Sequence, residues 1–174
     1  MPTATLLVNR APVLTLWAAI VAQRLGHGRA TALTLGKAVA GLNAQSKGRR
    51  LGIFEAPRSK KPPPSKRKMV LLLGRAVPVV KTPTGLRAVI KGKPESPTAV
   101  ERYLARKIGR ALPEVEAAMR QLAKAHRPKR LAAIAFELYE QFRPKVPEDV
   151  KGWGAKGKLT LAKIRDATAQ GSLN

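Results

Sequence analysis

The side chains that could support catalysis are few in this chain of 174 residues, and they are widely separated. Cysteine is absent, which excludes disulfides, thiol nucleophiles and cysteine-ligated zinc. The chain has two histidines, His27 and His126, so a metal site built from several imidazoles is not expected. Metal-dependent nucleases and phosphotransferases gather carboxylates around Mg²⁺, but the 10 carboxylates here all lie at or after Glu55. The composition therefore predicts a protein that is not an enzyme and holds no metal or cofactor.

Two glutamates, Glu137 and Glu140, are three residues apart and would share one face of a predicted helix. Such a pair could act as a general acid and a general base if both carboxylates lay in a cavity. Both glutamates flank an apolar stripe, as solvent-facing residues do. We interpret them as surface charges.

The segment from Gly152 to Gly157 fits the G-x-G-x-x-G pattern of nucleotide-binding loops, and its extension to Lys158 approaches the P-loop pattern. Both patterns must follow a buried strand, but residues 145–149 contain a proline and charged side chains. The P-loop also needs Ser or Thr directly after its lysine, where this chain has Leu159. The segment does not predict a nucleotide site.

The same loop offers a different chemistry, because it combines lysines with a tryptophan. An indole can stack on a base while neighbouring ammonium groups contact phosphates. The alternative is that the tryptophan covers the core beneath the last predicted helix. The candidate binding residues of this loop are Lys151, Trp153, Lys156 and Lys158.

The overall charge of the chain indicates the kind of partner it has. Lys and Arg number 34 against 10 Asp and Glu, which gives a formal net charge of +24. Hydrophobic residues make up 44% of the chain, more than a disordered basic tail contains, so a folded core is expected. A surface this positive repels itself, and a polyanion such as nucleic acid is the simplest partner.

A strongly basic stretch divides the chain. Residues 47–68 contain nine basic side chains against Glu55 alone, and three consecutive prolines bias the backbone towards an extended form. We therefore expect a helical region over residues 1–54, an exposed basic linker over residues 55–68 and a second region over residues 69–174. The basic residues predicted to contact phosphates here are Lys47, Arg49, Arg50, Lys60, Lys61, Lys66, Arg67 and Lys68.

Apolar residues at helical spacing predict two helices before the linker, over residues 13–25 and 31–45. The sequence from Val21 to Gly26, followed by a short turn and the second helix, resembles a helix-turn-helix, in which a small residue, here Ala22, lets the helices cross. The resemblance implies that the second helix enters the major groove of DNA. Its groove-facing residues would be Arg29, Thr31, Thr34 and Lys37. The alternative is an ordinary antiparallel helix pair.

The helix-turn-helix hypothesis makes a prediction about burial. Thr34 and Lys37 should face solvent, whereas Leu35, Val39 and Leu42 should lie in the core. If Thr34 and Lys37 are buried instead, the helix pair is core scaffolding, and contacts with nucleic acid must come from other elements.

After the linker, short strands are predicted over residues 69–73, 77–80 and 86–91, with a turn at residues 82–85. Helices are then predicted to begin near residues 98, 113 and 128, the first with a capping box at Thr98, and a last helix spans residues 159–169. The predicted fold is therefore mainly α with a small β-hairpin or three-stranded element, an α+β protein that begins with a helix-turn-helix-like pair.

The helix predicted after residue 98 carries Arg102, Arg106 and Arg110 at steps of four on one face. Like charges at this spacing destabilise a helix, and Glu101 is the one acid nearby, so the stripe favours a role beyond solvation. Each guanidinium of such a row can form a charge-assisted, bidentate bond with a phosphate. We predict that this face follows a nucleic-acid backbone.

These patterns together predict a non-enzymatic protein that binds nucleic acid through phosphate contacts. DNA is preferred to RNA because the recognised element reads a groove and because aromatic side chains for base stacking are scarce. One alternative is a ribosome-associated or other RNA-binding protein. Another is a non-enzymatic helical scaffold that oligomerises or docks an acidic protein through the small residues Gly36, Ala40 and Gly41.

The longest uncharged run, residues 11–23, is shorter than the ~20 apolar residues of a membrane-spanning helix, so no contact with a membrane is expected. We expect a cytoplasmic protein associated with the nucleoid or with ribosomes. The acid-free N-terminus resembles an organellar transit peptide and leaves import into an organelle open.

Overall fold

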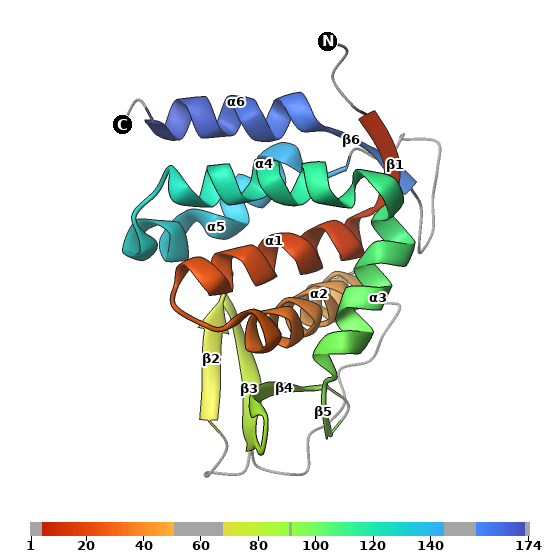
Figure 1. Ribbon diagram of the computed structural model, residues 1–174, viewed down its shortest axis with the longest axis vertical. Coiled ribbons are helices and arrows are strands. Elements are labelled where there is room, and N and C mark those ends of the chain that lie inside the picture. The colour runs from red at the N-terminus through yellow and green to blue at the C-terminus, as the bar shows by residue number, and fades with distance from the viewer. Residues whose placement is uncertain (1–4, 51–67, 91, 145–155, 173–174) are drawn as a thin grey trace.

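The computed structural model describes residues 5–50, 68–90, 92–144 and 156–172, and it shows an α+β fold, as predicted (Figure 1). The α-helices are α1 (Arg10–Arg24), α2 (Arg29–Arg50), α3 (Pro97–Ile108), α4 (Leu112–Lys124), α5 (Pro128–Phe142) and α6 (Leu161–Ser172). The strands are β1 (Thr5–Asn9), β2 (Lys68–Leu72), β3 (Arg75–Thr82), β4 (Gly85–Ile90), β5 (Lys93–Pro94) and β6 (Lys156–Thr160).

Helix α1 lies at the centre of the molecule, with α2 on one side and α4 and α5 on the other (Figure 1). Every residue from Pro12 to Ala22 is buried. A helix that is apolar all round must be covered all round, and this explains why α1 shows no polar face. The hydrophobic core surrounds this helix.

Trp17 joins α1 to α5. Its side chain is completely buried, and its indole Nε1–H donates a hydrogen bond to the carbonyl oxygen of Ala135 over 2.9 Å. The indole also meets the ring of Phe142 edge to face, with 5.4 Å between the ring centroids. The described residues before and after the basic stretch 47–68 therefore share one core, while residues 51–67, which include most of the predicted linker, lie outside the described part of the chain.

Helices α1 and α2 form the N-terminal helix pair that the apolar spacing predicts. They approach closely at Gly36, where a Cβ atom would overlap the carbonyl oxygen of Thr15 and crowd the backbone nitrogen of Ala19. Leu35 and Val39 are buried, and Leu42 is packed against the core. Only glycine lets the two backbones come this near.

Four strands form an antiparallel sheet in the order β2-β3-β4-β5, which confirms the small β-element. The predicted turn between β3 and β4 is present, and the Thr82 hydroxyl donates a hydrogen bond to the carbonyl oxygen of Gly85 over 2.7 Å. Helix α2 contacts β3 and β4. Leu72, Val77 and Val79 are buried on the inner face of the sheet.

Three consecutive helices, α3 to α5, begin with proline at the first or second position, where the missing N–H is not needed. The predicted capping box at Thr98 is wrong. Helix α3 begins one residue earlier, and the Ser96 hydroxyl caps it by accepting a hydrogen bond from the Ala99 N–H.

Strands β1 and β6 form a second antiparallel sheet that the sequence analysis does not predict. Thr5 lies opposite Thr160 and Asn9 opposite Lys156. Each strand has five residues, and its partner lies more than 140 residues away along the chain, so no local pattern reveals the pairing. The last helix is predicted over residues 159–169, but residues 159 and 160 belong to β6, so the helix begins at Leu161.

The contact between α1 and α2 leads to a paired glycine test. We expect Gly36→Ala to lower the free energy of unfolding by about 1 to 3 kcal/mol, because the new methyl group meets the backbone of α1. Gly41→Ala on the same helix meets nothing within 4 Å and should raise that free energy by roughly 0.5 to 1 kcal/mol. Chemical denaturation of both variants measures the two effects, and an equal response would contradict the close approach at Gly36.

Candidate nucleic-acid interface

The face of α2 that the helix-turn-helix hypothesis turns towards DNA lies inside the molecule. Thr34 is completely buried, and its hydroxyl accepts a hydrogen bond from the N–H of Ala88 over 3.0 Å and donates one to the carbonyl oxygen of Thr31 over 2.8 Å. The Thr31 hydroxyl in turn donates to the carbonyl oxygen of Leu86 over 2.7 Å. The prediction that Thr34 faces a groove is therefore wrong, because β4 covers this side of α2.

Lys37 is half-buried between α2 and α3 and does not project freely into solvent. Its ammonium nitrogen lies 3.5 Å from the centroid of the Tyr103 ring, a cation–π contact. Burial lowers the pKa of Lys37, and Arg106 and Lys107 lower it further, while Glu95 opposes them. The ammonium group of Lys37 therefore lies against α3, and the prediction that Lys37 projects from α2 into a groove is wrong.

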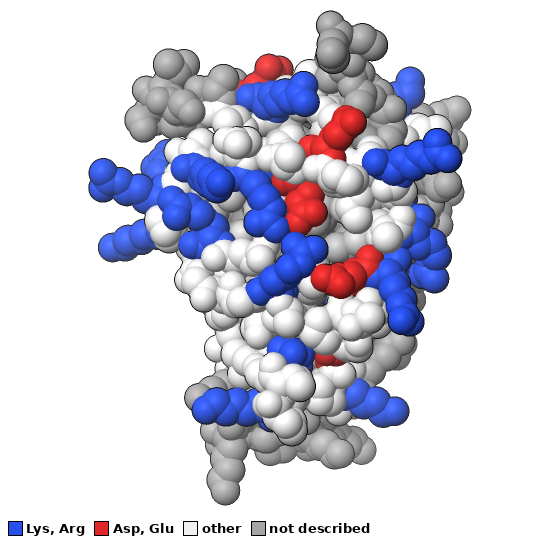
Figure 2. Space-filling view, viewed as in Figure 1, with Lys and Arg blue, Asp and Glu red and all other residues white. Residues whose placement is uncertain are grey.

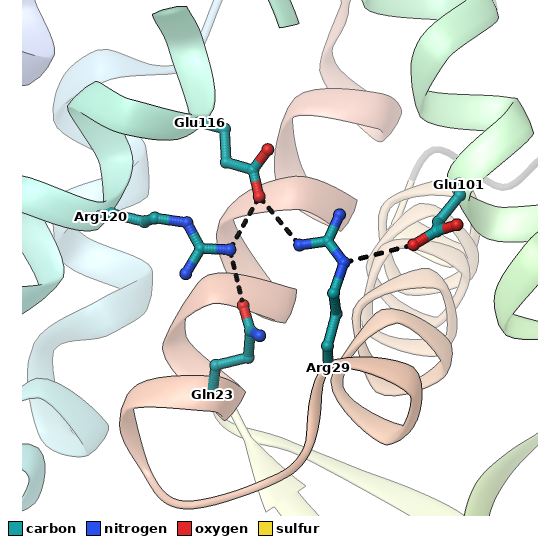
Figure 3. Close-up of polar contacts among 5 residues, drawn as sticks. All are labelled: Gln23, Arg29, Glu101, Glu116 and Arg120. Atoms are coloured by element: carbon teal, nitrogen blue, oxygen red, sulfur yellow. Dashed lines mark hydrogen bonds and ion pairs between the residues drawn. The ribbon is translucent and has the colours of Figure 1, made fainter. Parts of the chain in front are cut away.

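Arg29, on α2, belongs to a network of ion pairs and hydrogen bonds that joins four helices (Figure 3). Its Nε donates to Glu101 on α3 over 3.2 Å, and its Nη1 donates to Glu116 on α4 over 3.0 Å. The Oε1 atom of Glu116 also accepts from Arg120 over 2.8 Å, and Arg120 donates to Gln23 on α1 over 3.2 Å. Arg29 is half-exposed, but both of its carboxylate partners belong to the protein itself.

Glu116 at the centre of this network titrates abnormally. Burial on its own would raise its pKa, but hydrogen bonds from Arg120 and Arg29 outweigh burial and lower the pKa below the usual 4.5. The carboxylate therefore stays charged and holds both guanidinium groups. With Thr31, Thr34 and Arg29 all bonded within the protein, the N-terminal half of α2 is core scaffolding.

The arginine stripe on α3 is exposed as predicted. Arg102 and Arg106 face solvent, while Val100, Leu104 and Ile108 are buried on the opposite side. Helix α3 ends at Ile108, so Arg110 lies in the short 3₁₀ helix η1 (Gly109–Ala111) that follows α3. Within the described residues none of the three arginines forms an ion pair. With the exposed Lys107 they form what we call the α3 basic face: Arg102, Arg106, Lys107 and Arg110.

The described residues add little about the other predicted contacts. Lys158 is exposed on β6. Several predicted residues lie on described elements, but their side chains are outside the described part of the chain: Lys47, Arg49, Arg50, Lys68 and Lys156. The remaining predicted residues lie wholly outside the described residues: Lys60, Lys61, Lys66, Arg67, Lys151 and Trp153.

A second basic group escaped the sequence analysis. It lies where α4 ends and α5 begins, and Arg24 at the end of α1 joins it by donating a hydrogen bond to the carbonyl oxygen of His126 over 3.1 Å. We call it the α4–α5 basic corner: Arg24, Lys124, Arg127, Lys129 and Arg130. The run from Arg127 to Arg130 was visible in the sequence, but the contribution of Arg24 depends on a contact across 102 residues.

The two basic groups occupy opposite flanks of the face in Figure 2. Lys and Arg side chains gather over α3 on the right and near the turn between α4 and α5 on the left, and acidic side chains lie between them. Further basic side chains lie among these acidic ones, so the positive charge on this face is interrupted by carboxylates between the two basic groups.

Within the described residues, no group of three or more His, Asp or Glu side chains is placed to hold a metal ion. In the same part of the chain, no helix has the length and apolarity needed to cross a membrane.

The small residues proposed as a scaffold contact are partly used within the molecule, since Gly36 and Ala40 are buried. Comparison of the chain with protein-family models, with curated proteins and with solved structures finds no match.

The burial of Thr34 gives a test of its structural role. We expect Thr34→Val to lower the free energy of unfolding by about 1 to 3 kcal/mol, because the buried N–H of Ala88 loses its acceptor while the side chain keeps its shape. Thr98→Val, on the exposed first turn of α3, should change stability by no more than roughly 0.5 kcal/mol. If both variants unfold at the same denaturant concentration, Thr34 is not a structural residue.

His126 gives a test by pH. Burial lowers its pKa below the usual 6.5, and the charge of Arg130 lowers it further. The unfolded chain therefore binds this proton more tightly, and the stabilising effect of the neutral imidazole is lost as pH falls below 6.5. As pH is lowered from 6.5 to 4.5, the usual pKa values of histidine and glutamate, we expect the free energy of unfolding to fall more steeply for the wild-type protein than for His126→Gln. Denaturation at several pH values measures both slopes, and parallel slopes would contradict this assignment.

Proposed function

We propose that this protein binds nucleic acid through its phosphate backbone, with the α3 basic face as the described part of the contact surface. The observation that carries the proposal is that some arginines are paired with carboxylates of the protein itself and others are not. Glu101 and Glu116 bind Arg29 and Arg120, whereas the exposed arginines of α3 have no carboxylate partner in the described residues. Unpaired cations on one helix face attract a polyanion from outside the chain.

The spacing of the face suits a row of phosphates. Arg102 and Arg106 are one helical turn apart, which corresponds to a rise of about 6 Å along the helix axis. Each guanidinium can form a bidentate, charge-assisted bond with a phosphate, and a guanidinium keeps its charge at any physiological pH. Lys107 and the half-buried Lys37 add positive potential beside the row.

The proposed contact does not read base sequence through α2. With Thr34 covered by β4 and Arg29 bonded to two glutamates, no described residue of the predicted recognition face is free to enter a groove. The argument for DNA from a groove-reading helix therefore no longer holds, and only the scarcity of aromatic side chains still favours DNA over RNA. The shared chemistry is the phosphate backbone, and duplex DNA and structured RNA are the two ligands to compare.

Charge removal on α3 tests the proposal. The variant Arg102→Gln, Arg106→Gln, Lys107→Gln should bind duplex DNA or structured RNA more weakly. The slope of log K against log salt should fall in magnitude by about 0.9 for each duplex phosphate that the variant no longer neutralises. Its helical circular dichroism should be unchanged, because all three side chains are exposed. Fluorescence anisotropy with labelled duplexes of two unrelated sequences, and with an RNA hairpin, provides the affinities.

The matched control removes the same number of positive charges elsewhere. Lys81, Lys93 and Arg165 are exposed on the sheet and on α6. Their replacement by Gln should weaken binding less than the α3 variant does. Equal losses of affinity in the two variants would mean that net charge alone attracts the ligand, and an unchanged affinity of the α3 variant would exclude this face.

A further inference from the structure

Large apolar side chains are exposed mainly on one sheet. Within the described residues, the exposed large hydrophobic residues are Leu7, Met69, Leu71 and Val80. The last three belong to β2 and β3, and Leu71 and Met69 expose 73% and 53% of their surface. Exposure of single apolar residues is ordinary, but a contiguous group of them marks an interaction site.

The strand register places these residues on one face. Met69 lies opposite Pro78 and Leu71 opposite Ala76, so the four side chains share a side of the sheet. Val80 follows on the same side, because side chains two residues apart along a strand point the same way. We call this surface the outer sheet face: Met69, Leu71, Ala76, Pro78 and Val80.

The strand beside this face is at the edge of the sheet. Among the described strands, β2 pairs with β3 alone, so one side of its backbone has no strand partner (Figure 1). Natural edge strands are normally protected by charged side chains, prolines or bulges. Strand β2 carries one such residue, Lys68, at its first position, and the residues that follow, Met69 to Leu73, contain none of the protective types. An apolar edge of this kind accepts an added strand.

The positive charge of the protein indicates which kind of partner would bind the outer sheet face. The chain contains no acidic residue between Glu55 and Glu95, whereas Lys81 and Lys93 are exposed on this sheet. A second copy of the protein would bring a further net charge of +24 to this surface and would be repelled. An acidic partner is attracted by the same field.

We propose that β2 binds an extended segment of an acidic partner protein by strand addition. The segment pairs with the edge of β2 that has no described strand partner, its alternate apolar side chains cover Met69 and Leu71, and the positive charge of the protein attracts the carboxylates at its ends. This interaction is separate from the binding of nucleic acid, which uses α3.

A designed peptide serves as the probe. It consists of three valines alternating with threonines, flanked at each end by two glutamates and labelled with fluorescein. We expect the full-length protein to bind it in an anisotropy titration. The variant Met69→Thr, Leu71→Thr should bind about tenfold more weakly, because it keeps β-propensity but has less apolar surface to cover.

Three controls make the test specific. Leu7→Thr alters a leucine that is 62% exposed on the other sheet and should bind the peptide as the wild-type protein does. A peptide with lysines in place of the glutamates should bind at least about tenfold more weakly. The α3 variant Arg102→Gln, Arg106→Gln, Lys107→Gln should keep its affinity for the peptide, so failure of the nucleic-acid proposal and failure of this one are distinguishable.

Three results would overturn the proposal. The first is equal peptide affinity of the wild-type protein and the Met69→Thr, Leu71→Thr variant. The second is equal binding of the acidic and the basic peptide. The third is a wild-type dimer in sedimentation equilibrium that the β2 variant abolishes, since this would make a second copy the occupant.

Discussion

A helix in which all residues from Pro12 to Ala22 are buried can exist only where other elements cover its whole circumference. Helix α1 imposes this requirement, and α2, α3, α4 and α5 all contact it. Its few polar groups must also find partners away from water. The Thr15 hydroxyl donates to the carbonyl oxygen of Ala11 within the helix, and the Trp17 indole donates to Ala135 on α5. On α1 itself, the charged residues are therefore confined to the two ends of the helix, Arg10 and Arg24.

Helix α2 illustrates how a local pattern can suit two architectures. The spacing of Ala22, Gly26 and Leu35 fits two helices that cross, whether the second helix reads DNA or fills a core. A recognition helix needs one uncovered face, but α2 meets α1 along Gly36, β4 along Thr34 and α3 along Lys37. The strand that covers Thr34 lies 54 residues further along the chain, so no pattern near the helix could reveal it.

The elements that the sequence predicts well are those whose signals are local. Apolar periodicity places the helices of residues 10–50 and 97–142 within a few residues of their observed bounds, and it correctly exposes Arg102 and Arg106. The site is less predictable, because its arginines differ only in their partners. Arg29 and Arg102 look alike in the sequence, but Arg29 meets Glu101 and Glu116 from 72 and 87 residues away. The pairing of β1 with β6 escapes prediction for the same reason.

That pairing also determines when the fold can be completed. Strand β1 precedes its partner β6 by more than 140 residues of chain, so β1 is synthesised long before the strand it pairs with. Closing so long a loop costs entropy that no local contact repays, so this two-stranded sheet should form late. During synthesis, the backbone N–H and C=O groups of β1 have no partner strand, and the side chain of Leu7 is exposed beside them. In a growing chain, the edge of β1 that later meets β6 therefore stays unpaired until residues 156–160 have been added.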